Sequence, residues 1–265
     1  MREIQLLRAR LLQYTHRFLI VISVMTLIGI SNITSALAAC DDPPAPKVNW
    51  SDCDKSGLDL SGVDLSDAVL TKTNLKNSNL QKSRLDGADM AFANLEQAQL
   101  VQIRAHGVRL VGANLHAANL TQARMPDARL DRANLTEAVI DNAVLSRAKL
   151  YAANLNKSSA KNATIDSANL EQVSMIDANF DGADLSNSEL SDSNLENVSL
   201  QQAKLFKTRL LNTNLSYGKF NRADLSRANL SGADILGTDF NQAILAYTLW
   251  PDRSRCRPTA ISTCK

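Results

Sequence analysis

Residues 113–135 read ANLHAANLTQARMPDARLDRANL, and the spacing of their apolar residues decides the fold. An alanine stands two positions before each large apolar residue of this stretch, and those apolar residues are Leu115, Leu120, Met125, Leu130 and Leu135. The pattern continues in both directions, because every position divisible by five from Leu60 to Leu245 is apolar. We call these positions the centres of a five-residue repeat over residues 58–245.

A period of five matches neither the 3.6-residue period of an α-helix nor the two-residue period of a strand. It predicts a chain that turns a corner every five residues, so that four corners close a coil of twenty residues. The centre and the small residue two positions before it would point inward. Residues 58–245 would then form about nine coils, stacked about 4.8 Å apart with their backbones paired as in parallel strands.

Reading the sequence at intervals of twenty places chemically similar residues above one another. On one inner wall this column is Phe180, Leu200, Phe220 and Phe240. On one outer wall it is mostly asparagine, from Asn74 through Asn134 to Asn214, and stacked amides can hydrogen-bond along the axis. Alternatively, the asparagines are simply part of the repeated motif, and their amides are hydrated instead of hydrogen-bonded to one another.

The repeated motif A-(D/N)-L-x-x, as in Ala93-Asn94-Leu95, resembles that of the pentapeptide repeat protein family. The resemblance implies an all-β fold, a right-handed quadrilateral parallel β-helix. Members of the family also suggest two different kinds of function. Some exported bacterial members resemble this chain in having a Cys- and Trp-containing segment at each end, whereas others are acidic cytoplasmic DNA mimics that protect topoisomerases from quinolones.

The two ends of such a stack need covers, because unpaired backbone edges invite association and solenoids carry capping segments. We predict an N-terminal cap segment at residues 39–57 and a C-terminal cap segment at residues 246–265. Trp50 and Trp250, the only tryptophans of the chain, flank the repeat and would act as apolar lids.

The four cysteines allow three pairings. The sequence-local choice pairs Cys40 with Cys53 and Cys256 with Cys264, one disulfide for each cap segment. The alternative is that Leu37-Ala38-Ala39-Cys40 is a bacterial lipobox whose cysteine is lipidated. Lipidation would leave an odd thiol in an exported protein, so we favour the disulfide.

Residues 1–38 have the features of a secretory signal peptide, namely a basic start, an apolar run over residues 18–30 and the small-residue site Ala36-Leu37-Ala38. An uncleaved membrane anchor is the alternative, but spanning a bilayer takes about 20 apolar residues. Cleavage would remove four arginines and one glutamate from 29 basic and 27 acidic residues, leaving a net charge of −1. An exported chain would also meet an oxidising compartment, which permits disulfides.

One charged feature stands out from this near-neutral background. In the twenty-residue register, basic residues stack on two adjacent walls of the N-terminal half, and they are Arg84, Arg104 and Arg124 followed by Arg109, Arg129 and Lys149. This basic stripe would suit an anionic partner such as a lipid headgroup, a polysaccharide or an acidic protein. The competing interpretation is a solvated face neutralised by nearby carboxylates, namely Asp86, Asp127, Asp131 and Asp141.

The sequence contains no recognisable catalytic constellation. Motifs of the types H-E-x-x-H, G-x-S-x-G, P-loop and C-x-x-C are all missing, and we expect no cofactor, no metal site and no nucleic acid partner. His106 and His116 are half a coil apart and would lie on opposite walls. We therefore predict an exported, non-enzymatic scaffold or interaction protein of the bacterial envelope, with the DNA-mimic and Cys40-lipoprotein functions as alternatives. The short tail after Trp250 leads us to expect a monomer.

Overall fold

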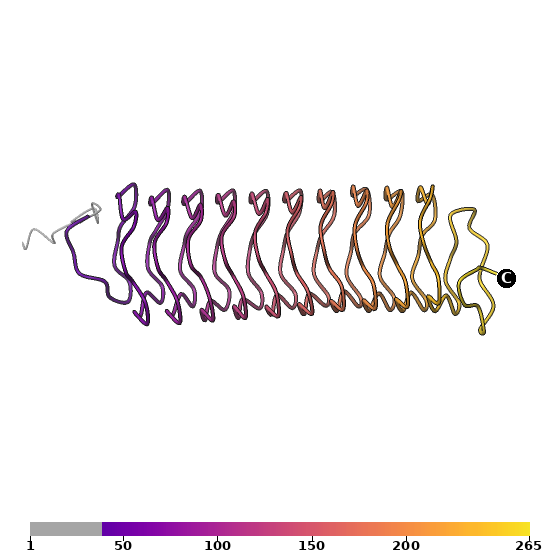
Figure 1. Cartoon of the computed structure of the whole chain (residues 1–265). Helices are drawn as coiled ribbons and strands as arrows, with labels where there is room; N and C mark the ends of the chain where they lie inside the picture. Colours follow the sequence, from indigo (N-terminus) through magenta and orange to yellow (C-terminus); the bar gives the residue numbers. More distant parts are fainter. Residues whose placement is uncertain (1–38) are drawn as a thin grey trace, which may run out of the picture. The chain divides into compact units, whose positions relative to one another are not determined.

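The computed structural model describes residues 39–265, and the expected signal peptide, residues 1–38, lies outside the described residues. Within the described part, the chain winds through successive coils that stack along one axis (Figure 1). Residues 39–265 contain no helix that is long and apolar enough to cross a membrane.

Neighbouring coils meet through parallel bridges between residues twenty apart, such as Asn94 with Asn114. The bridges form four columns, one for each side of the coil. We number these columns walls 1 to 4 after the first residue of each, which is Asn49, Asp54, Asp59 and Asp64 respectively. The bridging residue is always the one before a centre, and we call it the mid-wall residue.

Each side of the coil is shorter than the strands that we expected. Residues 39–265 contain no extended strand and no helix, only single-residue bridges separated by turns. The backbone still pairs in both directions along the axis. The Asn94 N–H donates to the Thr73 carbonyl of the preceding coil at 3.0 Å, and the Leu95 N–H donates to the Asn114 carbonyl of the next coil at 2.7 Å. A corner begins directly after the centre, so the pairing cannot lengthen.

The corners depend on a left-handed residue. Every residue two positions after a centre, from Lys47 to Tyr247, has a φ between 52° and 73°. Glycine adopts this conformation without steric cost, yet most corners carry other residues, so the surrounding hydrogen bonds must hold them there. At Gly112 a side chain is excluded for a second reason, because a Cβ there would lie 2.6 Å from the ring of Phe92.

The interior is filled by the centres and by the small residues two positions before them. Phe180, Leu200, Phe220 and Phe240 belong to one column of centres and are buried. The rings of Phe220 and Phe240 lie 5.3 Å apart, and the Trp250 ring lies 5.2 Å from that of Phe240. The Trp250 ring therefore packs against the end of the aromatic column from half a coil further along the chain.

Serine or threonine replaces alanine at several of the small inner positions. The buried Thr73 hydroxyl donates to the Trp50 carbonyl at 2.7 Å, and the buried Thr213 hydroxyl donates to the Leu190 carbonyl at 2.9 Å. Because a buried hydroxyl is costly only when it lacks a partner, these bonds let the narrow interior accept a polar group. Among the described residues, Ser83 Oγ is the buried side-chain oxygen that has no such partner.

Coiling begins before the repeat is recognisable in the sequence. Asn49 already bridges Val69, so the second part of residues 39–57 belongs to the first coil. The Trp50 side chain is 1% exposed and its indole N–H donates to the Asp42 carbonyl at 3.1 Å. Cys40 and Cys53 form a disulfide with their Cα atoms 5.4 Å apart, which ties the segment before the first coil to that coil.

The C-terminal segment turns back across the last coil. It runs antiparallel to it, with bridges between Ile244 and Ile261 and between Leu249 and Arg255. The second disulfide, between Cys256 and Cys264, closes this returning segment into a loop. Both disulfides are the sequence-local pairs, and this segment covers part of the backbone edge at the end of the stack.

We expect the double substitution Cys256→Ser and Cys264→Ser to lower the free energy of unfolding by about 2–4 kcal/mol, because the open loop regains conformational freedom in the unfolded chain. Urea unfolding of the oxidised protein and of the variant measures the difference. Wild-type protein in reducing buffer is the control, and reduction of the variant should add only the contribution of Cys40–Cys53. A variant as stable as the oxidised wild type would contradict a stabilising role for this bond.

Candidate functional site on the outer walls

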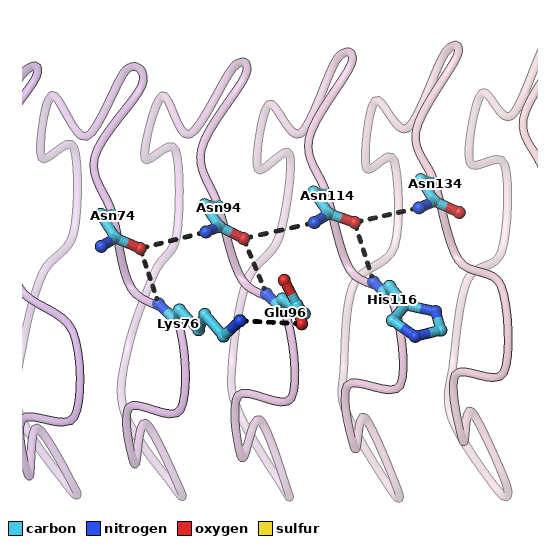
Figure 2. Close-up of polar contacts among 7 residues, drawn as sticks. All are labelled: Asn74, Lys76, Asn94, Glu96, Asn114, His116 and Asn134. Atoms are coloured by element: carbon cyan, nitrogen blue, oxygen red, sulfur yellow. Dashed lines mark hydrogen bonds and ion pairs between the residues drawn. The ribbon is translucent and has the colours of Figure 1, made fainter.

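Wall 2 carries a ladder of asparagine side chains. Figure 2 shows Asn74, Asn94, Asn114 and Asn134 stacked one above another on successive coils. The amide nitrogen of each donates to the amide oxygen of the one before it, at 3.1 Å for Asn94, 3.3 Å for Asn114 and 3.0 Å for Asn134. The stacked amides therefore bond along the axis.

The same amide oxygens also close the backbone corner. The N–H of the residue two positions on donates to the asparagine oxygen, as for Lys76 to Asn74 and His116 to Asn114, both at 3.2 Å (Figure 2). This is the Asx-turn contact that makes Asn and Asp favourable before a turn. The contact explains why the repeat prefers Asn or Asp at the mid-wall position.

The ladder is interrupted between Asn134 and Asn154, although both positions carry asparagine. Asn154 accepts the backbone N–H of Asn156 at 3.0 Å but makes no bond to Asn134. The ladder resumes further along, where Asn214 donates to Asn194 at 3.0 Å. Because these amides satisfy the protein's own groups, the asparagine ladder on wall 2 is a structural element.

The basic stripe lies on walls 4 and 1, which meet at a corner. Arg84 bridges Arg104 and Arg104 bridges Arg124 on wall 4, while Arg109, Arg129 and Lys149 follow one another on wall 1. The structure thus stacks both sets of side chains on successive coils. Their ionic environments, however, are different.

Three of the arginines have carboxylate partners. Arg84 lies 3.3 Å from Asp64, and Arg109 lies 2.9 Å from Asp89, in each case a residue twenty positions earlier. Arg84 also lies 3.4 Å from Asp86, and the Arg129 guanidinium lies 3.8 Å from Asp131, two positions on in each case. Nearby carboxylates therefore neutralise these three arginines of the stripe.

Arg104 and Arg124 have no such partner. Both side chains are exposed, and within residues 39–265 neither guanidinium makes an ion pair or a side-chain hydrogen bond. The residue twenty positions before Arg124 is Arg104, and the one before Arg104 is Arg84, so the ladder places cation above cation. Like charges opposite one another on paired backbones are destabilising.

The carboxylates that the sequence placed near these arginines are engaged elsewhere. Asp127 lies 2.6 Å from Arg147 and 3.2 Å from the His106 ring. Hydrogen bonding by the Arg147 guanidinium is the main reason that the pKa of Asp127 falls below its ordinary value. Asp141 accepts the Ser159 hydroxyl and the Lys161 N–H on the neighbouring wall.

The pKa is lowered at other carboxyl groups too, among them three near the start of the stack. Hydrogen bonds from the serine two positions on lower the pKa of Asp54, Asp59 and Asp64. A general acid or base at neutral pH needs a pKa near the working pH, and these shifts move the groups away from it. No cluster of three potential metal ligands occurs among residues 39–265, and the His116 ring bonds to the Thr136 carbonyl.

A shallow groove of about 500 Å³ on wall 4 contains the two unpaired arginines. Its lining residues are Gln102, Arg104, Gln122, Arg124, Asn142 and Val144. The glutamines and Asn142 are corner residues twenty positions apart, and sequence reasoning missed them. They could have been found by reading the corner positions, as well as the mid-wall positions, at intervals of twenty.

Comparison with known proteins agrees with this architecture. The family described as pentapeptide repeats matches in eight copies, over residues 56–90, 88–127, 128–165, 165–202 and 208–245. Because the match covers most of the chain, the protein belongs to the pentapeptide repeat family. A search of curated protein sequences finds no match.

Two solved structures illustrate the structural likeness. HetL, a pentapeptide repeat protein involved in heterocyst differentiation regulation in the cyanobacterium Nostoc sp. strain PCC 7120, is 29% identical, with a TM-score of 0.55 over 75% of this chain and 91% of HetL. Trypsin-treated QnrB1, a plasmid-mediated fluoroquinolone resistance protein, is 19% identical, with a TM-score of 0.50 over 58% of this chain and 75% of QnrB1. The second likeness shows the fold alone.

We expect Asn114→Ala to lower the free energy of unfolding by about 1–3 kcal/mol, because it removes two ladder bonds and the turn contact to His116. Asn154→Ala is the matched control, since it removes a turn contact but no ladder bond, and should cost about 1 kcal/mol. Urea unfolding of both variants measures the ladder as the difference. Equal losses would mean that the stacked amides contribute nothing beyond the turn.

Proposed function

We propose that this protein is an exported scaffold of the bacterial envelope that works by binding a partner on its outer walls rather than by catalysing a reaction. The observation that carries the proposal is the filled interior. Along the stack the inward positions hold aliphatic, aromatic or hydrogen-bonded hydroxyl side chains, and the charged groups stand on the outside. Catalysis requires convergent polar groups in a cleft, which such a column does not build.

The disulfides support export. Each end of the described part carries one, and such bonds persist in oxidising compartments such as the periplasm. The basic and apolar character of residues 1–38 adds the sequence argument for a signal peptide. Together these features favour a periplasmic or extracellular protein.

The two alternatives have less support. A lipoprotein needs a free Cys40 thiol, whereas the Cys40 sulfur is bonded to Cys53. A DNA mimic needs a strongly acidic surface, whereas wall 4 presents Arg104 and Arg124 without carboxylate partners. The likeness to QnrB1, at 19% identity, is evidence for a shared fold and not for a shared activity.

Cell fractionation followed by intact-mass analysis tests export and anchorage together. We expect a protein that is released with the periplasm, starts at Ala39 and has lost the hydrogens of all four cysteine thiols. A variant in which Ala36 and Ala38 are both replaced by Leu is the control, because it should retain residues 1–38 and the membrane fraction.

Other masses would contradict the proposal in distinguishable ways. An N-terminal Cys40 carrying acyl chains would establish the lipoprotein. A chain of 28.9 kDa with reduced thiols in the cytoplasm would overturn export altogether.

A further inference from the structure

The groove on wall 4 combines uncompensated positive charge with free hydrogen-bond donors. Its lining contains two arginines, three primary amides and a valine, and no carboxylate. The local excess is therefore two positive charges. A volume of about 500 Å³ lies within the usual range for small-molecule sites.

The two arginines occupy mid-wall positions, where many repeats carry Asn or Asp. A mid-wall Asn or Asp accepts the N–H two positions on, as Asn114 does for His116. An arginine cannot accept that bond. After Arg109, for example, the Val111 N–H has no acceptor among residues 39–265.

The backbone N–H two positions on is treated differently after each of the two arginines. After Arg104, the His106 N–H donates instead to the Asp86 carboxylate of the preceding coil at 2.9 Å. After Arg124, the corresponding residue is Pro126, which has no N–H to satisfy. The corner geometry is thus maintained without help from either side chain, and both guanidinium groups are free to meet a ligand.

The amides beside the arginines are oriented by one another. The Gln102 amide nitrogen donates to the Gln122 amide oxygen at 2.7 Å, which leaves the N–H₂ group of Gln122 as a donor. Arg104 and Arg124 lie on adjacent coils, so their guanidinium groups and the Gln122 amide can all donate to one anionic group in the groove. A phosphate monoester carries about −1.5 to −2 charges and three acceptor oxygens, and so matches both the charge and the donors better than a carboxylate does.

We propose that the groove between Arg104, Arg124 and Gln122 binds the phosphate group of a small soluble molecule. The ligand would relieve the repulsion between the stacked cations, so binding should stabilise the folded protein. The inference deepens the proposed binding function by naming a ligand class for one wall. It concerns purified protein, so its failure would leave the fractionation result unaffected.

Isothermal titration of the oxidised protein with inorganic phosphate tests the site. We expect saturable one-to-one binding and a rise of the melting temperature with phosphate concentration. The variants Arg104→Gln and Arg124→Gln should each weaken binding about tenfold, since each removes charge-assisted hydrogen bonds. Both side chains are exposed, so melting without phosphate should show that the variants are folded.

Arg109→Gln is the matched control. It is also a mid-wall arginine, but Asp89 neutralises it at 2.9 Å, so phosphate affinity should stay within about twofold of the wild type. Arg104→Lys and Arg124→Lys should bind phosphate more tightly than the corresponding Gln variants but less tightly than the wild type, because lysine keeps the charge but not the planar fork.

Four results would overturn the proposal. The first is no saturable phosphate binding, and the second is an equal loss in Arg109→Gln, which would indicate general electrostatics. The third is acetate binding as tightly as phosphate. The fourth is binding to vesicles containing phosphatidic acid while free phosphate neither binds nor competes. That last outcome would assign the groove to a membrane surface instead of a soluble ligand.

Discussion

The structure depends on one constraint, which is that a chain turning every five residues must still pair most of its backbone N–H groups with other coils or with its own corners. In residues 93–97, the N–H of the mid-wall Asn94 bonds to the preceding coil. The N–H groups of the centre Leu95 and of the left-handed Gln97 bond to the following coil. The small residue that follows the corner closes the turn. The fifth N–H, directly after the centre, bonds to the mid-wall Asn or Asp side chain. Such a hydrogen bond contributes about 0.5–1.5 kcal/mol, so the Asn or Asp side chain stabilises each corner at which it stands.

Much of this architecture could be predicted from the sequence, because the period acts on every coil. The unbroken series from Leu60 to Leu245 predicted the four-sided coil, and proximity predicted both disulfides. The period implied short sides, but it did not show that backbone pairing shrinks to one bridge per side. That limit follows from the left-handed corner residue. The early start of the coil was also hidden, since Asn49 and Trp50 take part in it without the Ala-Asn-Leu motif.

The ion pairs illustrate a different limit. Neutralisation was judged from carboxylates close in sequence, whereas Arg84 and Arg109 each pair with an Asp twenty positions earlier. Side chains on one wall contact each other at that interval, so the register determines which charges meet. Read this way, the sequence does distinguish Arg124, whose neighbour at that interval is another arginine. The engagement of Asp127 by Arg147 and His106 needed coordinates, because it depends on which way a corner side chain turns.

Stability and binding therefore compete for the same place in this fold. A mid-wall side chain either completes its own corner, as Asn114 does, or leaves that corner and is available to other partners, as Arg104 is in the proposed phosphate site. Behind Arg104 the corner N–H bonds to Asp86, and behind Arg124 the proline at position 126 has no N–H. Since the interior is packed with apolar side chains, such exchanges on the walls are one way for a column of this kind to acquire a binding site. The cost of each is local, because the neighbouring coils keep their own corners.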